Sequence, residues 1–243
     1  KGMERDTVIG STMVDMYVKS GSLSEAQEVF HKLDIRDIVS WNTLVAGYTE
    51  LGYDKEALKL CEQMRRENIL PNALTFLCII KACANLGFIE KGREIHTEIK
   101  RNGLGNDVVI GTALVNMYAN CGLLHKAQEV FDQISAQDVT TWNVLMDGYE
   151  KCGDGEKTLQ CFEQMQLKGI PPNTISFICI LKACGVEGDV ENGKKIHVEI
   201  ARNGLLETDL IVGNTLIDMY AKCGLFSNAQ EVFDKLRRKD VIT

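Results

Sequence analysis

One eleven-residue stretch occurs three times along this chain with few changes. It is STMVDMYVKSG from Ser11, TALVNMYANCG from Thr112 and NTLIDMYAKCG from Asn214. Met, Tyr and Gly keep their places, whereas the first residue changes from Ser to Thr to Asn. Such self-similarity is the signature of a repeat architecture, in which each unit buries its apolar face against its neighbours.

The repeat has a larger period that contains three unequal segments. Asp6, Asp107 and Asp209 open equivalent segments, so the period is 101 and then 102 residues. Because the chain opens with KGMERD, inside the tail of a segment, we expect it to be an excerpt from a longer protein. The predicted segments are 1–5 (the tail of an upstream long repeat), 6–36 (short), 37–71 (standard), 72–106 (long), 107–137 (short), 138–172 (standard), 173–208 (long), 209–239 (short) and 240–243 (the start of a further repeat).

Each full segment carries two helical patterns. In segment 37–71 the first is a stripe of Trp41, Leu44, Val45 and Tyr48, at the i, i+3, i+4, i+7 spacing of one helix face. The presence of only three prolines in 243 residues also favours helices. We therefore predict an all-α chain of about 14 helices, stacked as helix-turn-helix repeats into a right-handed α-solenoid superhelix.

Helix starts are predicted from polar residues at the front of each pattern. Asp54 is the predicted N-cap of the second helix of segment 37–71. In the short segments, Ser24 with Gln27 and Ser227 with Gln230 match a capping box.

The net charge of −7 argues against a nonspecific duplex binder, which needs many Lys and Arg side chains to displace counterions. It leaves open a protein that binds single strands through base edges. No apolar run is long enough to span a membrane, so no membrane partner is predicted.

Cysteines and histidines mimic catalytic and metal motifs. The nine cysteines include no C-x-x-C pair, and most recur in copied contexts, so we interpret them as small buried packing residues in a reducing compartment. His96 and His197 supply the H-x-E half of a zinc deaminase signature, but the P-C-x-x-C half is absent. Both are interpreted as packing positions, and we predict no metal, no cofactor and no catalytic residue in this chain.

The chain resembles the pentatricopeptide repeat family, in the subclass whose repeats alternate short, standard and long. The short type resembles GNTLIDMYAKCGLFSNAQEVFDKL, the standard type VSWNTLVAGYTELGYDKEALKLCEQM and the long type TFLCIIKACANLGFIEKGREIH. The resemblance implies binding of single-stranded RNA, one base per repeat, in a plant mitochondrion or chloroplast. The subclass is mostly found in factors for cytidine-to-uridine RNA editing, whose deaminase, where present, usually follows the repeats.

In this family the fifth and last residues of a repeat together read one base, and we call them the reading residues. The resemblance implies the pairs Ser11–Asp37, Asn42–Asn72, Thr112–Asp138, Asn143–Asn173 and Asn214–Asp240.

The chemistry of these side chains suggests which bases they select. An ionised Asp only accepts hydrogen bonds, so it suits the N1–H of G or the N3–H of U, whereas an Asn amide can also donate to C or A. Short Ser or Thr at the fifth position leaves room for a purine, and longer Asn reaches a pyrimidine. The predicted order is G–Y–any–G–Y–any–U, 5′ to 3′, with C preferred by the Asn pairs.

The long repeats pair Leu77 with Asp107 and Ile178 with Asp209. Because the fifth residues of these pairs are aliphatic, we expect weak base selection there. Long repeats also resemble docking sites for small accessory editing proteins.

Two further sets of residues follow from the resemblance. The second residues of the repeats should stack on base faces, with Thr140 as the polar exception; we call them the stacking residues, and they are Val8, Val39, Leu74, Val109, Thr140, Ile175, Ile211 and Ile242. Lysines near the ends of first helices resemble phosphate contacts, and they are Lys19, Lys151 and Lys222.

Simpler interpretations stay open. The opening Asp and Asn residues suit helix caps, the stacking residues suit an ordinary core, and the lysines suit a solvated face. A peptide-binding tetratricopeptide-like scaffold is the alternative function, because WNTLVAGY from Trp41 comes close to W-x2-L-G-x2-Y. We also expect self-association through uncapped ends, because Val232, Phe233 and Leu236 would be partly without a neighbour.

Overall fold

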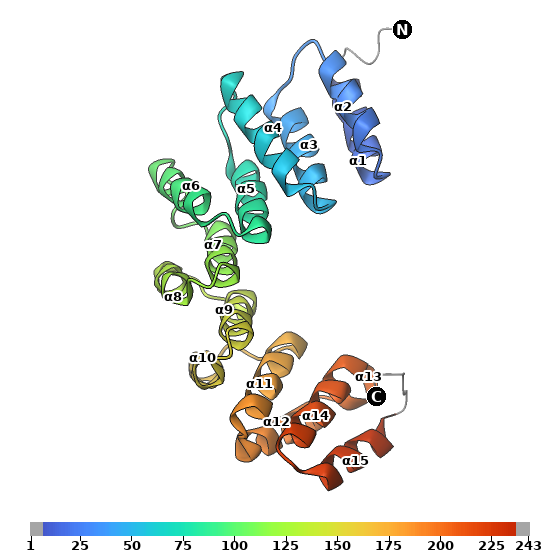
Figure 1. Cartoon of the computed structure of the whole chain (residues 1–243), viewed down its shortest axis with the longest axis vertical. Coiled ribbons are helices and arrows are strands. Elements are labelled where there is room, and N and C mark those ends of the chain that lie inside the picture. The colour runs from blue at the N-terminus through green and yellow to red at the C-terminus, as the bar shows by residue number, and fades with distance from the viewer. Residues whose placement is uncertain (1–6, 237–243) are drawn as a thin grey trace. The chain divides into compact units, whose positions relative to one another are not determined.

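The computed structural model describes residues 7–236, and within that range it contains helices and no strands (Figure 1). Fourteen of these helices have ten or more residues and one, α13, has four, so the predicted all-α fold and the number of about 14 helices are confirmed. The helices are α1 (Thr7–Lys19), α2 (Leu23–Lys32), α3 (Ile38–Glu50), α4 (Asp54–Arg66), α5 (Ala73–Leu86), α6 (Ile89–Arg101), α7 (Val108–Asn120), α8 (Leu124–Gln133), α9 (Val139–Lys151), α10 (Gly155–Leu167), α11 (Thr174–Glu187), α12 (Val190–Arg202), α13 (Leu205–Thr208), α14 (Leu210–Lys222) and α15 (Phe226–Lys235).

The chain forms two compact units, Lys1–Leu123 and Leu124–Thr243. In the first unit, α1, α3, α5 and α7 pack one against the next, and α2, α4 and α6 each pack on the helix before them. The second unit repeats this arrangement, with α9, α11 and α14 in sequence and α10, α12 and α15 beside them. Each unit is therefore a stack of helical hairpins, which is the repeat-solenoid fold.

The core of each unit is built around a tryptophan of the standard repeat. Trp41 and Trp142 are almost completely buried. The ring of Trp41 meets Phe30 edge to face with centroids 4.7 Å apart, and Trp142 meets Phe131 in the same way at 4.6 Å. Such pairs add about 0.5–1.5 kcal/mol beyond area burial. Every residue of the predicted stripe that begins at Trp41 is buried, so this prediction is confirmed.

The turn inside each hairpin depends on glycine. Gly52 has a φ of 81°, in the left-handed region that only glycine adopts at little cost. Its backbone N–H donates to the carbonyl of Thr49, and the next N–H, of Tyr53, donates to Tyr48. These bonds satisfy carbonyls that the end of α3 would otherwise leave unpaired.

The caps predicted for the second helices are wrong. Asp54 is the first residue of α4 rather than its N-cap, and its Oδ2 accepts a bond from Asn85 Nδ2 at 3.1 Å. Ser24 and Ser227 lie inside the first turns of α2 and α15. Capping boxes occur instead at the starts of α5 and α11, because Asn is followed there by a hydroxyl residue at the third helical position.

Two of the three residues of the α15 face that is predicted to be partly uncovered are buried. Val232 is fully buried and Leu236 is 5% exposed. Leu236 lies so close to Gly213 of α14 that a Cβ on this glycine would come within 2.6 Å of it. Leu236, which follows the last turn of α15, and α14 cover each other within the hairpin, whereas Phe233 stays partly exposed. The face is thus covered only in part, and self-association stays a prediction.

Six of the cysteines are buried and all nine are free thiols, as the packing interpretation predicts for most of them; Cys152 is exposed. Burial raises the pKa of Cys61 and Cys179 to about 12, so these thiols are protonated at neutral pH. Within residues 7–236 no helix combines the length and apolar character of a membrane span.

Candidate nucleic-acid interface

Among residues 7–236, the predicted last residue of each repeat is the N-cap of the next first helix. Asp37 Oδ1 accepts the backbone N–H of Ser40 at 2.9 Å, and Asn72 Oδ1 accepts that of Thr75 at 3.1 Å. The same bond forms at Asp107, Asp138, Asn173 and Asp209. The interpretation of these residues as helix caps is therefore correct, and each cap is worth about 0.5–2 kcal/mol.

Capping uses only one side-chain oxygen of each aspartate. At Asp107 and Asp138 the capping bond is accepted by Oδ1, and both side chains are exposed. The bonds that Asp138 accepts from the backbone and hydroxyl of Thr141 lower the pKa of its carboxyl group. The carboxylate is thus ionised at neutral pH and can cap the helix with one oxygen while it accepts a further bond with the other.

The two Asn–Asn pairs predicted from the sequence are in direct contact. Asn42 Nδ2 donates to Asn72 Oδ1 at 3.0 Å, and Asn143 Nδ2 donates to Asn173 Oδ1 at 2.9 Å. The partners are 30 residues apart in sequence. Asn42 and Asn143 are each 5% exposed, whereas their partners lie at the surface. The fifth and last residues of a standard repeat therefore form one polar unit.

The other predicted pairs are not joined in this way. The Ser11 hydroxyl is buried and has no partner among the described residues, so no bond links it to Asp37. Thr112 Oγ1 donates to the carbonyl of Val108 at 2.8 Å. Thr112 and Asp138 belong to different units, so their pairing stays a prediction.

In the third short repeat, Asn214 is partly buried on α14 and Asp240 lies outside the described residues. The aliphatic fifth residues Leu77 and Ile178 are partly buried on α5 and α11.

The stacking residues lie at the surface. Their exposed fractions run from 48% at Leu74 to 76% at Val8, and Thr140 is also exposed, so ordinary core packing is the wrong interpretation. Each precedes the fifth residue by three positions, which places both on one helix face. Ile242 lies outside the described residues; the exposed aliphatic members are Val8, Val39, Leu74, Val109, Ile175 and Ile211.

Each predicted phosphate lysine is paired with an aspartate one turn earlier on its helix. The distances from Nζ to the carboxylate are 2.7 Å for Lys19–Asp15, 2.6 Å for Lys151–Asp147 and 2.7 Å for Lys222–Asp218. All three lysines are exposed. Their charges are therefore largely balanced locally, a feature that the motif comparison did not anticipate.

The histidines that mimic a deaminase motif are packing residues, as predicted. His96 Nδ1 lies 3.0 Å from the hydroxyl of Tyr118, and His197 Nδ1 lies 2.9 Å from that of Tyr220. Burial lowers the pKa of His197. Across the described residues no group of His, Cys, Asp or Glu is placed to hold a metal ion.

Family models match along most of the chain. A model described as "PPR repeat family" matches residues 36–85 and 137–186, and one described as "PPR repeat" matches residues 11–38, 74–104, 112–139 and 214–241. The chain belongs to the pentatricopeptide repeat family. This result favours the predicted family over the tetratricopeptide alternative.

Similar pentatricopeptide repeat proteins come from Arabidopsis thaliana. The chain is 36% identical over 238 residues to pentatricopeptide repeat-containing protein At3g24000, mitochondrial, and 32% identical over 241 residues to pentatricopeptide repeat-containing protein At4g18520, chloroplastic. These alignments cover 98% and 99% of the chain but 37% and 39% of the relatives. The chain thus spans less than half the length of the curated relatives it matches.

Solved pentatricopeptide repeat structures share the fold. The chain superposes on PPR10 in complex with an 18-nucleotide psaJ RNA element with a TM-score of 0.76 and 18% identity, covering 98% of this chain and 36% of that one. Maize PPR10 gives a TM-score of 0.61 with 21% identity, covering 100% of this chain and 41% of that one. These likenesses confirm the repeat-solenoid fold.

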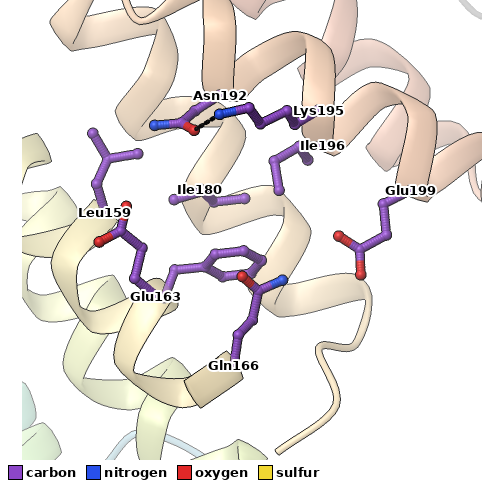
Figure 2. Close-up of a pocket in the computed structure, with 9 residues that line it drawn as sticks. Leu159, Glu163, Gln166, Ile180, Asn192, Lys195, Ile196 and Glu199 are labelled. Atoms are coloured by element: carbon purple, nitrogen blue, oxygen red, sulfur yellow. Dashed lines mark hydrogen bonds between the residues drawn. The ribbon is translucent and has the colours of Figure 1, made fainter. Parts of the chain in front are cut away.

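A groove of about 330 Å³ lies between the second helices α10 and α12 of this pentatricopeptide repeat chain (Figure 2). Ile180 and Ile196 contribute apolar surface, and Glu163, Lys195 and Glu199 contribute charge. None of its lining residues is a reading residue, a stacking residue or one of the predicted phosphate lysines. Two carboxylates against one ammonium suit a polyanion poorly, so the groove is not part of the candidate interface.

Two residues of the polar units were missed at the level of sequence. Thr75 and Ser176 bond Asn42 and Asn143, respectively, from the next repeat along the chain. A single repeat motif carries no signal for them, because each belongs to the repeat after the one whose Asn it contacts. An alignment of the repeat segments with one another shows a hydroxyl residue at this position in several repeats.

Proposed function

We propose that this chain binds single-stranded RNA with one base per repeat, and that it belongs to the targeting region of an organellar cytidine-to-uridine editing factor. The observation that supports this most directly is the pair of Asn–Asn units. On α3 the exposed aliphatic Val39 precedes Asn42 by three positions, whereas the equivalent exposed residue on α9 is Thr140. A polar unit beside an exposed apolar side chain suits a base, which has a polar edge and an apolar face. The likeness to PPR10, whose structure holds an RNA element, supports the same function.

The proposed base preferences follow from the polar side-chain atoms of the reading residues that helix capping does not use. Asp37, Asp138 and Asp240 offer an acceptor, which suits G beside Ser11 and Thr112, and U beside the longer Asn214. The Asn units offer donors, which suits C. The proposed order is G–Y–any–G–Y–any–U from 5′ to 3′, with little selection in the long repeats.

The subclass and its setting are part of the proposal. The alternation of short, standard and long segments supports the editing-factor subclass, and the long repeats would accept small accessory editing proteins. The relatives named mitochondrial and chloroplastic support a location in one of these organelles.

Selection of bound RNA from a random pool tests this function. We expect enrichment of G at two positions three nucleotides apart, under Ser11 and Thr112, with a pyrimidine after each. A pool selected on a chain that carries Ser11→Asn and Thr112→Asn is the matched control and should show U at both positions. No enrichment with either chain would contradict the proposal, and tighter binding to acidic peptides than to RNA would favour the peptide-binding alternative.

A further inference from the structure

Each Asn–Asn unit has one fully buried hydroxyl group that contacts both of its members. Thr75 Oγ1 donates to Asn42 Oδ1 at 2.6 Å and accepts the backbone N–H of Asn72 at 3.1 Å. In the second unit, Ser176 makes the same two bonds, to Asn143 Oδ1 at 2.7 Å and from the backbone N–H of Asn173 at 3.1 Å. Thr75 and Ser176 are each the third residue of the following first helix. The reading unit of a standard repeat therefore has three members.

The hydrogen bonds leave one consistent orientation for both amides. The backbone N–H of Thr75 can only donate, so the Asn72 atom that faces it is the oxygen. That oxygen also receives the bond from Asn42, so the Asn42 atom beside it is the nitrogen. The Asn42 oxygen must then face the Thr75 hydroxyl, which donates to it. The Thr75 hydroxyl thereby completes a closed set of donors and acceptors.

This orientation decides what the unit can offer to a base. Asn72 Oδ1 is occupied by the cap and by Asn42, so Asn72 presents its NH2 group, with two hydrogens, at the surface. Donors match the N3 and O2 acceptors of cytosine, whereas uracil carries a hydrogen on N3. If the Asn42 amide were free to turn, its oxygen could accept that hydrogen and the distinction would weaken.

The pattern along the chain links the hydroxyl to polar reading. A hydroxyl residue stands at this third position wherever the preceding repeat has a polar fifth residue, at Ser40, Thr75, Thr141, Ser176 and Thr243. Where the preceding fifth residue is Leu77 or Ile178, the third position holds Ile110 or Val212 instead. At Ser40 the hydroxyl donates to the carbonyl of Asp37 rather than to Ser11, so the direct bond to a fifth residue is seen where that residue is Asn, at Thr75 and Ser176.

We propose that Thr75 and Ser176 are positioning residues that hold Asn42 and Asn143 in the amide orientation that selects cytosine over uracil. The inference rests on the proposed RNA-binding function and adds a third residue to each specificity unit. It places base selection by a standard repeat partly in the sequence of the repeat that follows.

The test compares Thr75→Val with Thr75→Ser in RNA binding. The RNAs follow the proposed order and differ only in C or U at the second position. For the unaltered chain we expect a preference for C of about tenfold, the range of one good base contact. Thr75→Val should bring the two affinities to within about twofold of each other. Thr75→Ser should keep the preference, because Ser176 makes the same bonds in the other unit.

Two controls separate orientation from folding. Thr49→Val removes a buried hydroxyl that bonds the carbonyl of Val45 on the same helix, and it should leave the preference for C unchanged. Ser176→Ala repeats the test at the fifth RNA position in the other unit, independently of whether Thr75→Val folds. Side-chain amide resonances of Asn42 in the RNA-free chain should be protected from exchange, and Thr75→Val should remove that protection.

The outcomes distinguish this inference from the proposed function. An unchanged preference for C in folded Thr75→Val, or in Ser176→Ala at its own position, overturns the inference. So does an unaltered chain that selects G as proposed but does not distinguish C from U. Absence of sequence-selective RNA binding by the unaltered chain overturns the proposed function as well.

Discussion

The side-chain nitrogen of Asn143 lies 2.9 Å from the side-chain oxygen of Asn173, 30 residues further along the chain. Asn42 and Asn72 make the same contact at 3.0 Å in the other unit. Because each amide carries two hydrogens and two oxygen lone pairs, these bonds leave polar atoms to spare. Capping and base recognition are therefore compatible tasks for one side chain.

Thr112→Asn should change the preferred base at the fourth RNA position from G to U. The longer side chain reaches a pyrimidine, and Asp138 still supplies an acceptor. The fold should persist, because Asn214 occupies the equivalent place in the third copy of the motif. Binding to RNAs that differ only at that position measures the change. Unaltered preference with an intact helical circular dichroism signal would show that Thr112 does not read a base.

Asp138→Asn should separate capping from base recognition. Asn and Asp cap helices about equally, so we expect the free energy of unfolding to change by less than about 0.5 kcal/mol. The outward atom changes from an acceptor to a donor, so the preference at the fourth position should change from G to A. Urea unfolding and RNA binding measure the two effects.

Asp138→Ala is the matched control for this substitution. It should lose about 0.5–2 kcal/mol of stability together with the base preference. Retention of G selectivity by Asp138→Asn would exclude the Asp138 carboxylate as a reading group.

Val109→Ser should weaken RNA binding without unfolding the chain. Val109 is 62% exposed, so its replacement should change stability by no more than about 0.5 kcal/mol. Loss of apolar contact with a base face should lower affinity by about fivefold, the equivalent of roughly 1 kcal/mol. Val198→Ser, which changes a valine on α12 that is 51% exposed, is the control. Equal affinities of both variants would argue against a stacking role.

Asp147→Asn should strengthen RNA binding by releasing Lys151. The two side chains are 2.6 Å apart, so phosphate must compete with the carboxylate. With few phosphates neutralised, the unaltered chain should show a shallow salt slope of roughly −1 to −3, and the variant a slope steeper by about 0.7. Asp234→Asn makes the same charge change on α15, away from the predicted lysines. If both variants alter affinity and slope equally, only net charge matters.

Local features of this chain were predictable from its sequence. The stripe from Trp41 to Tyr48 predicted a buried helix face, and all of its members are buried. The position of Asn72 in the repeat predicted a partner at Asn42, and the two are bonded. These predictions succeeded because copied segments impose the same local conformation, and the repeat register then determines which residues meet.

Some predictions failed even at short range. Ser24 matched a capping box but lies within the first turn of α2, because this helix begins at Leu23, with Ser22 as its N-cap, two residues earlier than the match requires. In the α15 face that was expected to be partly uncovered, Val232 and Leu236 are buried and Phe233 is partly exposed. A helix boundary and the cover of an apolar face depend on neighbouring segments as well as on the local sequence.

The sequence by itself determined the family, the helical repeat and which positions are equivalent from one repeat to the next. These properties follow from the repeat period and from side-chain chemistry. Only the tertiary structure decided that Val8 and its equivalents are exposed, and that Thr75 orients Asn42 from the following repeat. Those properties arise where one repeat packs against the next. Burial and hydrogen-bond partners there are set by residues about 30 positions away, which no single motif contains.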